Sequence, residues 1–230
     1  MFYSKSFKKI KNIKHCFFSR RGGFSSGLYK SLNCGKGSRD KRKNILKNLE
    51  YVSQKMYVKK SRLILMHQTH SNKVKEISYA NLSKEINSDA MITKHKKIAL
   101  GVLTADCVPI LIYDKKNKII GCIHAGWKGA FSDIIKKTIN KIKKKNSNYE
   151  IIASVGPCIS TKSYEVDLSF YRKFIAKAKK NKKYFIFKKK NKKLFNLRKY
   201  VSDKLLELNV KVDHINRDTY KEKKNFFSYR

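Results

Sequence analysis

The stretch Ile98–Gly129, IALGVLTADCVPILIYDKKNKIIGCIHAGWKG, decides the fold of this chain. It has the lowest charge density in the sequence, and the polar insert Asp114–Lys118 separates its two apolar runs. Short apolar runs bounded by turn signals are typical of buried strands. We therefore expect strands at Ile98–Leu103, Val108–Tyr113 and Ile119–Ala125, and we expect these strands to form the centre of the protein.

The composition indicates a globular chain. Of 230 residues, 41% are hydrophobic and 12% are aromatic, which is enough to build a core. Only two prolines are present and no flexible linker is visible, so we expect a single domain over residues 1–230. A monomer and a homodimer are both compatible with the sequence.

The formal net charge of +40 points first to nucleic acid. However, lysine dominates the basic residues and is spread over the whole length, together with abundant Asn and Ile, as an AT-rich coding sequence would favour. Proteins that read nucleic-acid sequence use arginine and interleaved aromatic residues. We therefore expect a weak, salt-sensitive attraction to polyanions and no specific nucleic-acid partner.

Features that would place the chain in a membrane or outside the cell are not seen. No run of 18 apolar residues occurs, and the first twenty residues lack the apolar core of a signal peptide. The five cysteines form no CxxC pair, which fits free thiols in a reducing compartment. The expected location is the cytoplasm.

The remaining periodicities predict helices and strands in a mixed order. Mixed order favours an α+β fold with packed mixed β-sheets and outer helices over a doubly wound sheet. Further strands are expected at His15–Arg20, Arg62–Met66, Lys73–Ile77, Asp89–Thr93, Ile151–Val155, Tyr184–Phe187 and Val210–Ile215. Helices are expected at Ser38–Tyr57, Ala130–Lys145, Tyr164–Lys179 and Leu194–Leu208.

Three residues at the ends of apolar strands form a candidate metal site. His70, Cys107 and His124 are a plausible set of three zinc ligands that leaves a fourth position open. Their spacing is too long for a short-range metal motif, and each has a structural alternative. His124 could be a core histidine, His70 a surface loop residue and Cys107 a small buried hydrophobe.

Two other candidates concern substrate. Arg20 precedes a turn that holds three glycines between residues 22 and 27, and accessible backbone N–H groups beside arginine could hold an anion such as phosphate. An ordinary basic loop is the alternative. Gln68 lies beside the candidate site and could orient a base through its amide.

Several sequence blocks, taken in order, resemble one family. The blocks are FSRRGGFSSGLYKSLNCG, HQTHSNKV, SDAMIT, LTADCVPILIYD, GCIHAGWKGAF, VGPCIS, YEV and NFFSYR. Together they resemble the polyphenol oxidase (laccase-domain) family, also described as purine nucleoside phosphorylases. The resemblance implies zinc held by His70, Cys107 and His124. It also implies phosphorolysis of adenosine, inosine, guanosine and S-methyl-5′-thioadenosine, with adenosine deamination as a second activity.

The chain departs from the family pattern at three places. Lys128 replaces a common arginine and loses its bidentate fork. Asp218 stands where the family often has cysteine, and the sequence ends at Arg230 where relatives usually continue. If that tail closes the substrate pocket, activity is expected to suffer.

The candidate catalytic residues are Cys107 and Asp106. Zinc can activate water at neutral pH, and Asp106 is the nearest carboxylate in sequence to act as acid or base. Cys107 could be a nucleophile, although a ligand role is favoured. Two alternative functions stay open: a copper-dependent, laccase-like polyphenol oxidase, and a basic polyanion-binding protein with a decayed site.

Overall fold

The computed structural model describes residues 1–230 and is built around a six-stranded mixed sheet. The strand order is β11 (Lys211–His214), β7 (Ile151–Val155), β5 (Val108–Asp114), β6 (Ile119–Ala125), β3 (Ala90–Thr93) and β2 (Val74–Glu76). Of the three strands predicted in the opening stretch, β5 and β6 are the central antiparallel pair, whereas the third, at Ala99–Gly101, lies outside this sheet. The edge strands β11 and β2 run parallel to their neighbours. The predicted α+β fold is confirmed.

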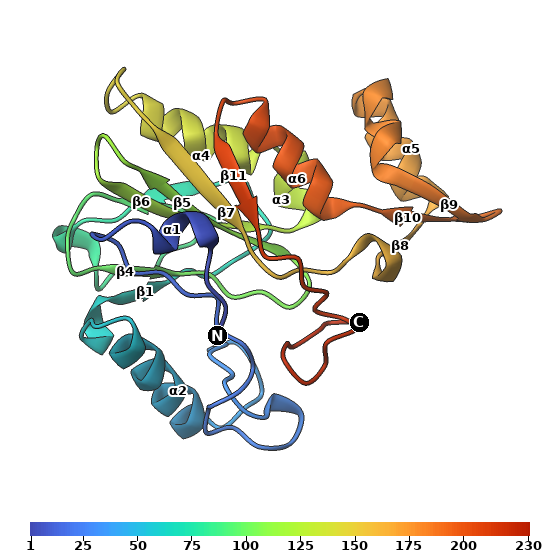
Figure 1. The fold of residues 1–230 in the computed structure, drawn as a ribbon. Coiled ribbons are helices and arrows are strands. Elements are labelled where there is room, and N and C mark those ends of the chain that lie inside the picture. Colours follow the sequence, from blue (N-terminus) through green and yellow to red (C-terminus); the bar gives the residue numbers. More distant parts are fainter.

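Alternation along β5 divides the core into two layers. Val108, Ile110 and Ile112 face α4 (Ile134–Lys143) and α6 (Leu197–Leu206) in the largest buried cluster, whereas Leu111 and Tyr113 face the opposite side. Figure 1 shows α3 (Trp127–Phe131), α4 and α6 on one side of the sheet. The other side is covered by β1 (Leu63–Leu65), β4 (Ala99–Gly101), α1 (Lys5–Lys8) and α2 (Arg42–Lys55). Strands β1 and β4 form a separate parallel pair.

A third part of the fold extends from one end of this body and shares its core, because Val166, Phe174 and Phe195 belong to the largest buried cluster. It consists of β8 (Glu165–Asp167), α5 (Leu168–Lys177), β9 (Phe185–Lys189) and β10 (Lys192–Phe195), with strand order β8-β10-β9. Figure 1 shows it projecting from one end of the molecule. We call residues 165–195 the arm. Short 3₁₀ turns occupy Gly27–Tyr29, Lys60–Arg62, Tyr79–Asn81, Thr161–Ser163 and Lys179–Tyr184.

Several predicted elements differ from the structure, for local reasons. The helix expected over Ala130–Lys145 is two helices, because Asp133 adopts a left-handed backbone (φ 65°) between α3 and α4. The helix expected from Tyr164 begins only at Leu168, where Asp167 caps it by accepting a hydrogen bond from Phe170 N.

Two further predictions were wrong: one helix begins later than expected, and one expected strand does not form. The start of the helix expected from Leu194 belongs to β10, and Asn196 caps α6 through Lys199 N. The strand expected at His15–Arg20 is only an isolated bridge between Phe17 and Phe2. No helix combines the length and the apolar character that crossing a bilayer requires.

Candidate metal centre

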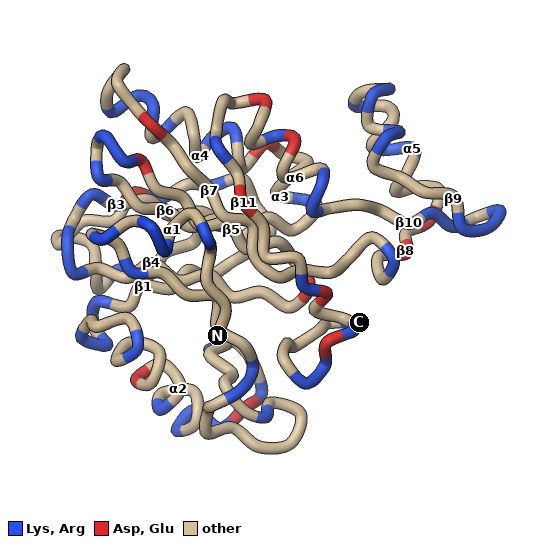
Figure 2. The backbone as a smooth tube through the Cα atoms, viewed as in Figure 1, with Lys and Arg blue, Asp and Glu red and all other residues tan.

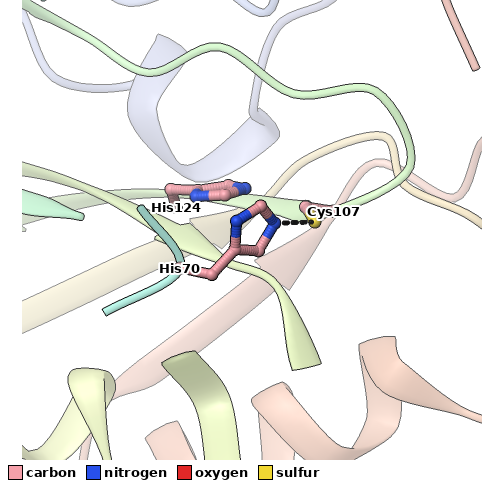
Figure 3. Close-up of side chains that lie close together, drawn as sticks. All are labelled: His70, Cys107 and His124. Carbon is pink, nitrogen blue, oxygen red and sulfur yellow. Dashed lines mark hydrogen bonds between the residues drawn. The ribbon is translucent and has the colours of Figure 1, made fainter. Parts of the chain in front are cut away.

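The structure brings together the three residues proposed as metal ligands. His124 lies on β6, on the sheet face away from the helices, and is 4% exposed. Cys107 immediately precedes β5, and His70 lies in the loop after β1 with a left-handed backbone (φ 58°). Their ligand atoms all lie within 4.8 Å of one another (Figure 3). The group could therefore hold a metal ion.

One distance within this group matches the separation of two ligand atoms around a tetrahedral zinc ion. His70 Nε2 lies 3.7 Å from Cys107 Sγ, and the two histidine ring centres are 4.7 Å apart. Zinc bond lengths of about 2.0–2.1 Å to nitrogen and 2.3 Å to sulfur would place these two atoms roughly 3.6 Å apart in a tetrahedron. The observed separation needs almost no adjustment.

Gly126 lies directly against the group and leaves no space for a side chain. A Cβ atom at this position would lie 2.7 Å from His70 Cδ2 and 2.9 Å from Cys107 Sγ. The backbone of Gly126 is ordinary (φ −65°), so the requirement for glycine here is steric. The glycine of the HAGW block therefore lets the helix start approach the ligands closely.

Asp89 organises two of the three ligands and was missed by the sequence reasoning. Its fully buried carboxylate accepts a 2.8 Å hydrogen bond at Oδ1 from His124 Nδ1, which leaves His124 Nε2 free to bind a metal. Oδ1 also accepts from His70 N, and Oδ2 accepts from Thr69 N, Ser71 N and Ser71 Oγ. One carboxylate thus holds both His124 and the loop that carries His70.

The electrostatics of the group depend on burial and on these hydrogen bonds. Burial opposes ionisation of Asp89, but hydrogen bonds from His124 and Ser71 outweigh it and hold the pKa of Asp89 below its ordinary value. Burial raises the pKa of the Cys107 thiol to about 12, and the charge of Asp106 adds to the effect. A bound cation would reverse this preference and stabilise the thiolate.

His70 is held in the form that binds metals. Burial lowers its pKa, and the neighbouring His124 and Lys128 lower it further. A neutral imidazole is the metal-binding form of histidine. Lys128 therefore lies close enough to influence the group.

Gln68, predicted to orient a base, has its amide engaged by the backbone of Leu103. Gln68 Nε2 donates to Leu103 O at 2.7 Å, and Leu103 N donates to Gln68 Oε1 at 2.9 Å. This pair ties the loop after β1 to the segment after β4, and so places His70 relative to Cys107. A role in substrate binding stays a prediction.

Asp106, predicted as an acid or base, binds the C-terminal segment. Its backbone is left-handed (φ 85°), and its carboxylate accepts from Thr219 Oγ1, Ser228 Oγ and Tyr229 N at 2.7–2.9 Å. These contacts favour a role in holding residues 219–230 beside Cys107. Its catalytic role stays a prediction.

Arg20, predicted to bind phosphate, lies at the glycine loop but donates to protein carbonyls. Its guanidinium donates to Lys30 O at 2.6 Å, Leu28 O at 3.3 Å and Lys223 O at 3.2 Å. Its Cζ atom also lies 4.3 Å from the centre of the Phe227 ring. These contacts join the loop to the C-terminal segment. Phosphate binding by Arg20 stays a prediction.

Asp218, noted in the sequence as a departure from the family pattern, accepts hydrogen bonds that join two segments of the protein. Its carboxylate accepts from Ser160 N, Ser160 Oγ, Ser163 Oγ and Tyr220 N. Burial opposes its ionisation, but the bonds from Ser160 and Ser163 outweigh it and lower the pKa of Asp218. It thereby fastens the 3₁₀ turn at Thr161–Ser163 to the C-terminal segment.

Comparisons with known proteins agree with the sequence blocks. The chain is 36% identical over 192 residues to a purine nucleoside phosphorylase of Rickettsia prowazekii, covering 81% of this chain and 77% of that protein. It is 34% identical over 180 residues to a purine nucleoside phosphorylase of Bacteroides thetaiotaomicron, covering 74% and 67%.

Solved structures share the fold, and a family model covers nearly the whole sequence. A Neisseria meningitidis protein superposes with a TM-score of 0.84 at 29% identity, covering 92% of this chain and 85% of that one. A Bacillus licheniformis hypothetical protein reaches 0.87 at 22% identity, with 92% and 85% coverage. The family model described as multi-copper polyphenol oxidoreductase laccase matches residues 14–230. This chain therefore belongs to the multi-copper polyphenol oxidoreductase laccase family.

Proposed function

We propose that this chain is a zinc-dependent purine nucleoside phosphorylase. Its proposed substrates are phosphate and adenosine, inosine, guanosine or S-methyl-5′-thioadenosine, with adenosine deamination as a second activity. The observation that carries the proposal is the convergence of His70, Cys107 and His124, whose ligand atoms all lie within 4.8 Å of one another. The names of the relatives supply the substrate class.

The chain's own residues have distinct parts in this proposal. His70, Cys107 and His124 would hold zinc, which when bound supplies a Lewis acid beside the substrate. Asp89 would fix the tautomer of His124 by accepting from Nδ1 at 2.8 Å. Cys107 is proposed as a ligand, because a thiolate held by zinc is a poorer nucleophile.

Zinc is preferred to copper because of the ligand groups that the fold offers. Oxidation by several copper ions would need several groups of nitrogen and sulfur ligands. The structure assembles one such group, and its two histidines and one cysteine leave one tetrahedral position for water or substrate. The copper-dependent oxidase is retained as the alternative to be tested.

The test combines metal analysis with an assay. Protein purified without added metal is expected to contain about one zinc per chain. Incubation with adenosine and phosphate should yield adenine and ribose 1-phosphate, and inosine should report deamination. His124→Ala is expected to lose both the zinc and the products.

His67→Ala is the matched control, because His67 is exposed in the same segment and lies outside the ligand group. The control should keep both metal and activity. Products formed by zinc-free His124→Ala protein would refute the assignment of the site. Stoichiometric copper together with oxygen-dependent oxidation of a phenol would favour the oxidase.

A further inference from the structure

The arm concentrates positive charge far more strongly than the rest of the molecule. Residues 165–195 contain twelve lysines and arginines but only two acids, Glu165 and Asp167. Figure 2 shows this charge on α5 and on the outer end of the β9–β10 hairpin. The arm also projects from the body (Figure 1), so a partner can reach it without touching the core.

Part of this charge has no acidic partner within the protein. Glu165 on β8 pairs with Lys188 at 2.5 Å and with Lys192 at 3.7 Å. Two exposed lysines at the end of the hairpin make no salt bridge: Lys189, which ends β9, and Lys190, which forms the turn with Asn191. These two ammonium groups are therefore available to an external anion.

The hairpin also exposes aromatic surface beside its lysines. Phe187 is 66% exposed and Ile186 is 56% exposed. Other aromatic side chains of the arm pack inward and form a cluster. The inward cluster comprises Phe170, Phe174, Phe185 and Phe195, with neighbouring ring centres 4.8–5.2 Å apart. Lys193 Nζ lies 4.5 Å from the Phe187 ring centre. The arm is thus a packed unit that presents one aromatic ring among cations.

This combination matches the chemistry of single-stranded nucleic acid. Proteins bind single strands without sequence preference by pairing a basic track with aromatic side chains on which bases stack. A lipid surface fits less well, because the tip of the hairpin, Lys190 and Asn191, carries no apolar side chain to insert, and two consecutive lysines separate the exposed Ile186 and Phe187 from that tip. Duplexes offer no unpaired base to Phe187.

We propose that the β9–β10 hairpin of the arm is a sequence-independent binding surface for single-stranded nucleic acid. A base stacks on Phe187, and Lys189 and Lys190 contact phosphates. This surface lies outside the metal centre, and the proposal does not depend on the proposed enzymatic function.

The test uses the full chain and fluorescein-labelled oligothymidylate of roughly 15 nucleotides, with a duplex of equal length. Fluorescence anisotropy is measured between about 50 and 200 mM NaCl. The single strand should bind more tightly than the duplex. K189Q/K190Q should reduce the slope of log affinity against log salt by about 1.4, which corresponds to two lost phosphate contacts. Phe187→Ala should weaken binding about tenfold at fixed salt without changing the slope.

The control replaces two exposed lysines on the body. K136Q/K137Q on α4 removes the same charge and should leave the slope unchanged. The proposal would be overturned in favour of diffuse charge attraction if the control lowered the salt dependence of the affinity as much as K189Q/K190Q does. Equal affinity for duplex and single strand would overturn it as well. Phosphatidylserine vesicles supply the lipid test. Vesicle binding lost in Phe187→Ala, with oligonucleotide affinity unchanged, would also overturn it.

Discussion

Asp89 connects the two histidines of the candidate metal centre, and Asp89→Asn tests that connection with little change in shape. Asparagine offers one oxygen where aspartate offers two, and its NH₂ group must face donors in either orientation. If the NH₂ group takes the place of Oδ2, it faces the N–H groups of Thr69 and Ser71. If it takes the place of Oδ1, it faces the backbone N–H of His70 and Nδ1 of His124. Two N–H groups lose their acceptor in both cases.

The expected loss follows from this count. Two N–H groups left without an acceptor should lower the free energy of unfolding by about 2–4 kcal/mol. Loss of the bond that orients His124 should also weaken metal affinity by about 10–100-fold. Unfolding in urea can be followed through Trp127, the only tryptophan, and metal affinity by competition with a chromogenic chelator.

Asp114→Asn provides the matched control. Asp114 is fully buried, lies at the opposite end of β5 from Cys107, and accepts from Lys116 N, Glu150 N and Asn117 Nδ2. Its replacement should reduce stability but leave metal affinity unchanged. If Asp89→Asn matched this control in both measurements, Asp89 would be a structural carboxylate with no part in orienting the ligands.

Three further substitutions test other parts of the structure. Gly126→Ala should crowd the side chains of His70 and Cys107, which should cost about 1–3 kcal/mol of stability and lower the metal content of the purified protein. Gly37→Ala is the control: a Cβ there meets open space, so stability and metal content should both stay unchanged. Asp218→Asn should lower the free energy of unfolding at pH 7. Because the folded-state pKa of Asp218 is lowered, the difference from the native protein should shrink as pH falls below about 4 in urea titrations, and a constant difference would contradict it. Gln68→Ala should cost about 1–3 kcal/mol by removing both bonds to Leu103. A raised KM for adenosine with unchanged stability would instead support the predicted role of Gln68 in orienting the base.

The strands of the central sheet were predictable because burial imposes a strong local pattern. Ile119–Ala125 and Ile151–Val155 have the predicted bounds, and both lie inside the sheet. The arm was less predictable, because lysines interrupt its apolar pattern. Its short strand at Glu165–Asp167 was included in a predicted helix, and so were the last two residues of the strand at Lys192–Phe195. Their strand conformation depends on pairing with each other, which is a tertiary effect.

The three candidate ligands were predictable from their positions near the ends of apolar strands: His70 follows β1, Cys107 precedes β5, and His124 lies one residue before the end of β6. Their partners were not, because hydrogen bonds across 18–20 residues, such as those from the His70 loop to Asp89, leave no periodic signal. One local signal was available. Asp89 directly precedes the buried strand Ala90–Thr93 in a chain with only 16 acids. A carboxylate next to a buried strand indicates a group that accepts hydrogen bonds inside the protein.

The scarcity of acids makes the two carboxylates around the metal centre informative. Asp89 and Asp106 each accept at least three hydrogen bonds from N–H or O–H groups. A lysine at either position would place a donor against those donors and a positive charge beside a cation site. The lysine content that raises the net charge to +40 is therefore compatible with the surface but not with these two positions. The chemistry of the site and the charge of the arm can accordingly be altered independently, which is why oligonucleotide binding and phosphorolysis should respond to different substitutions.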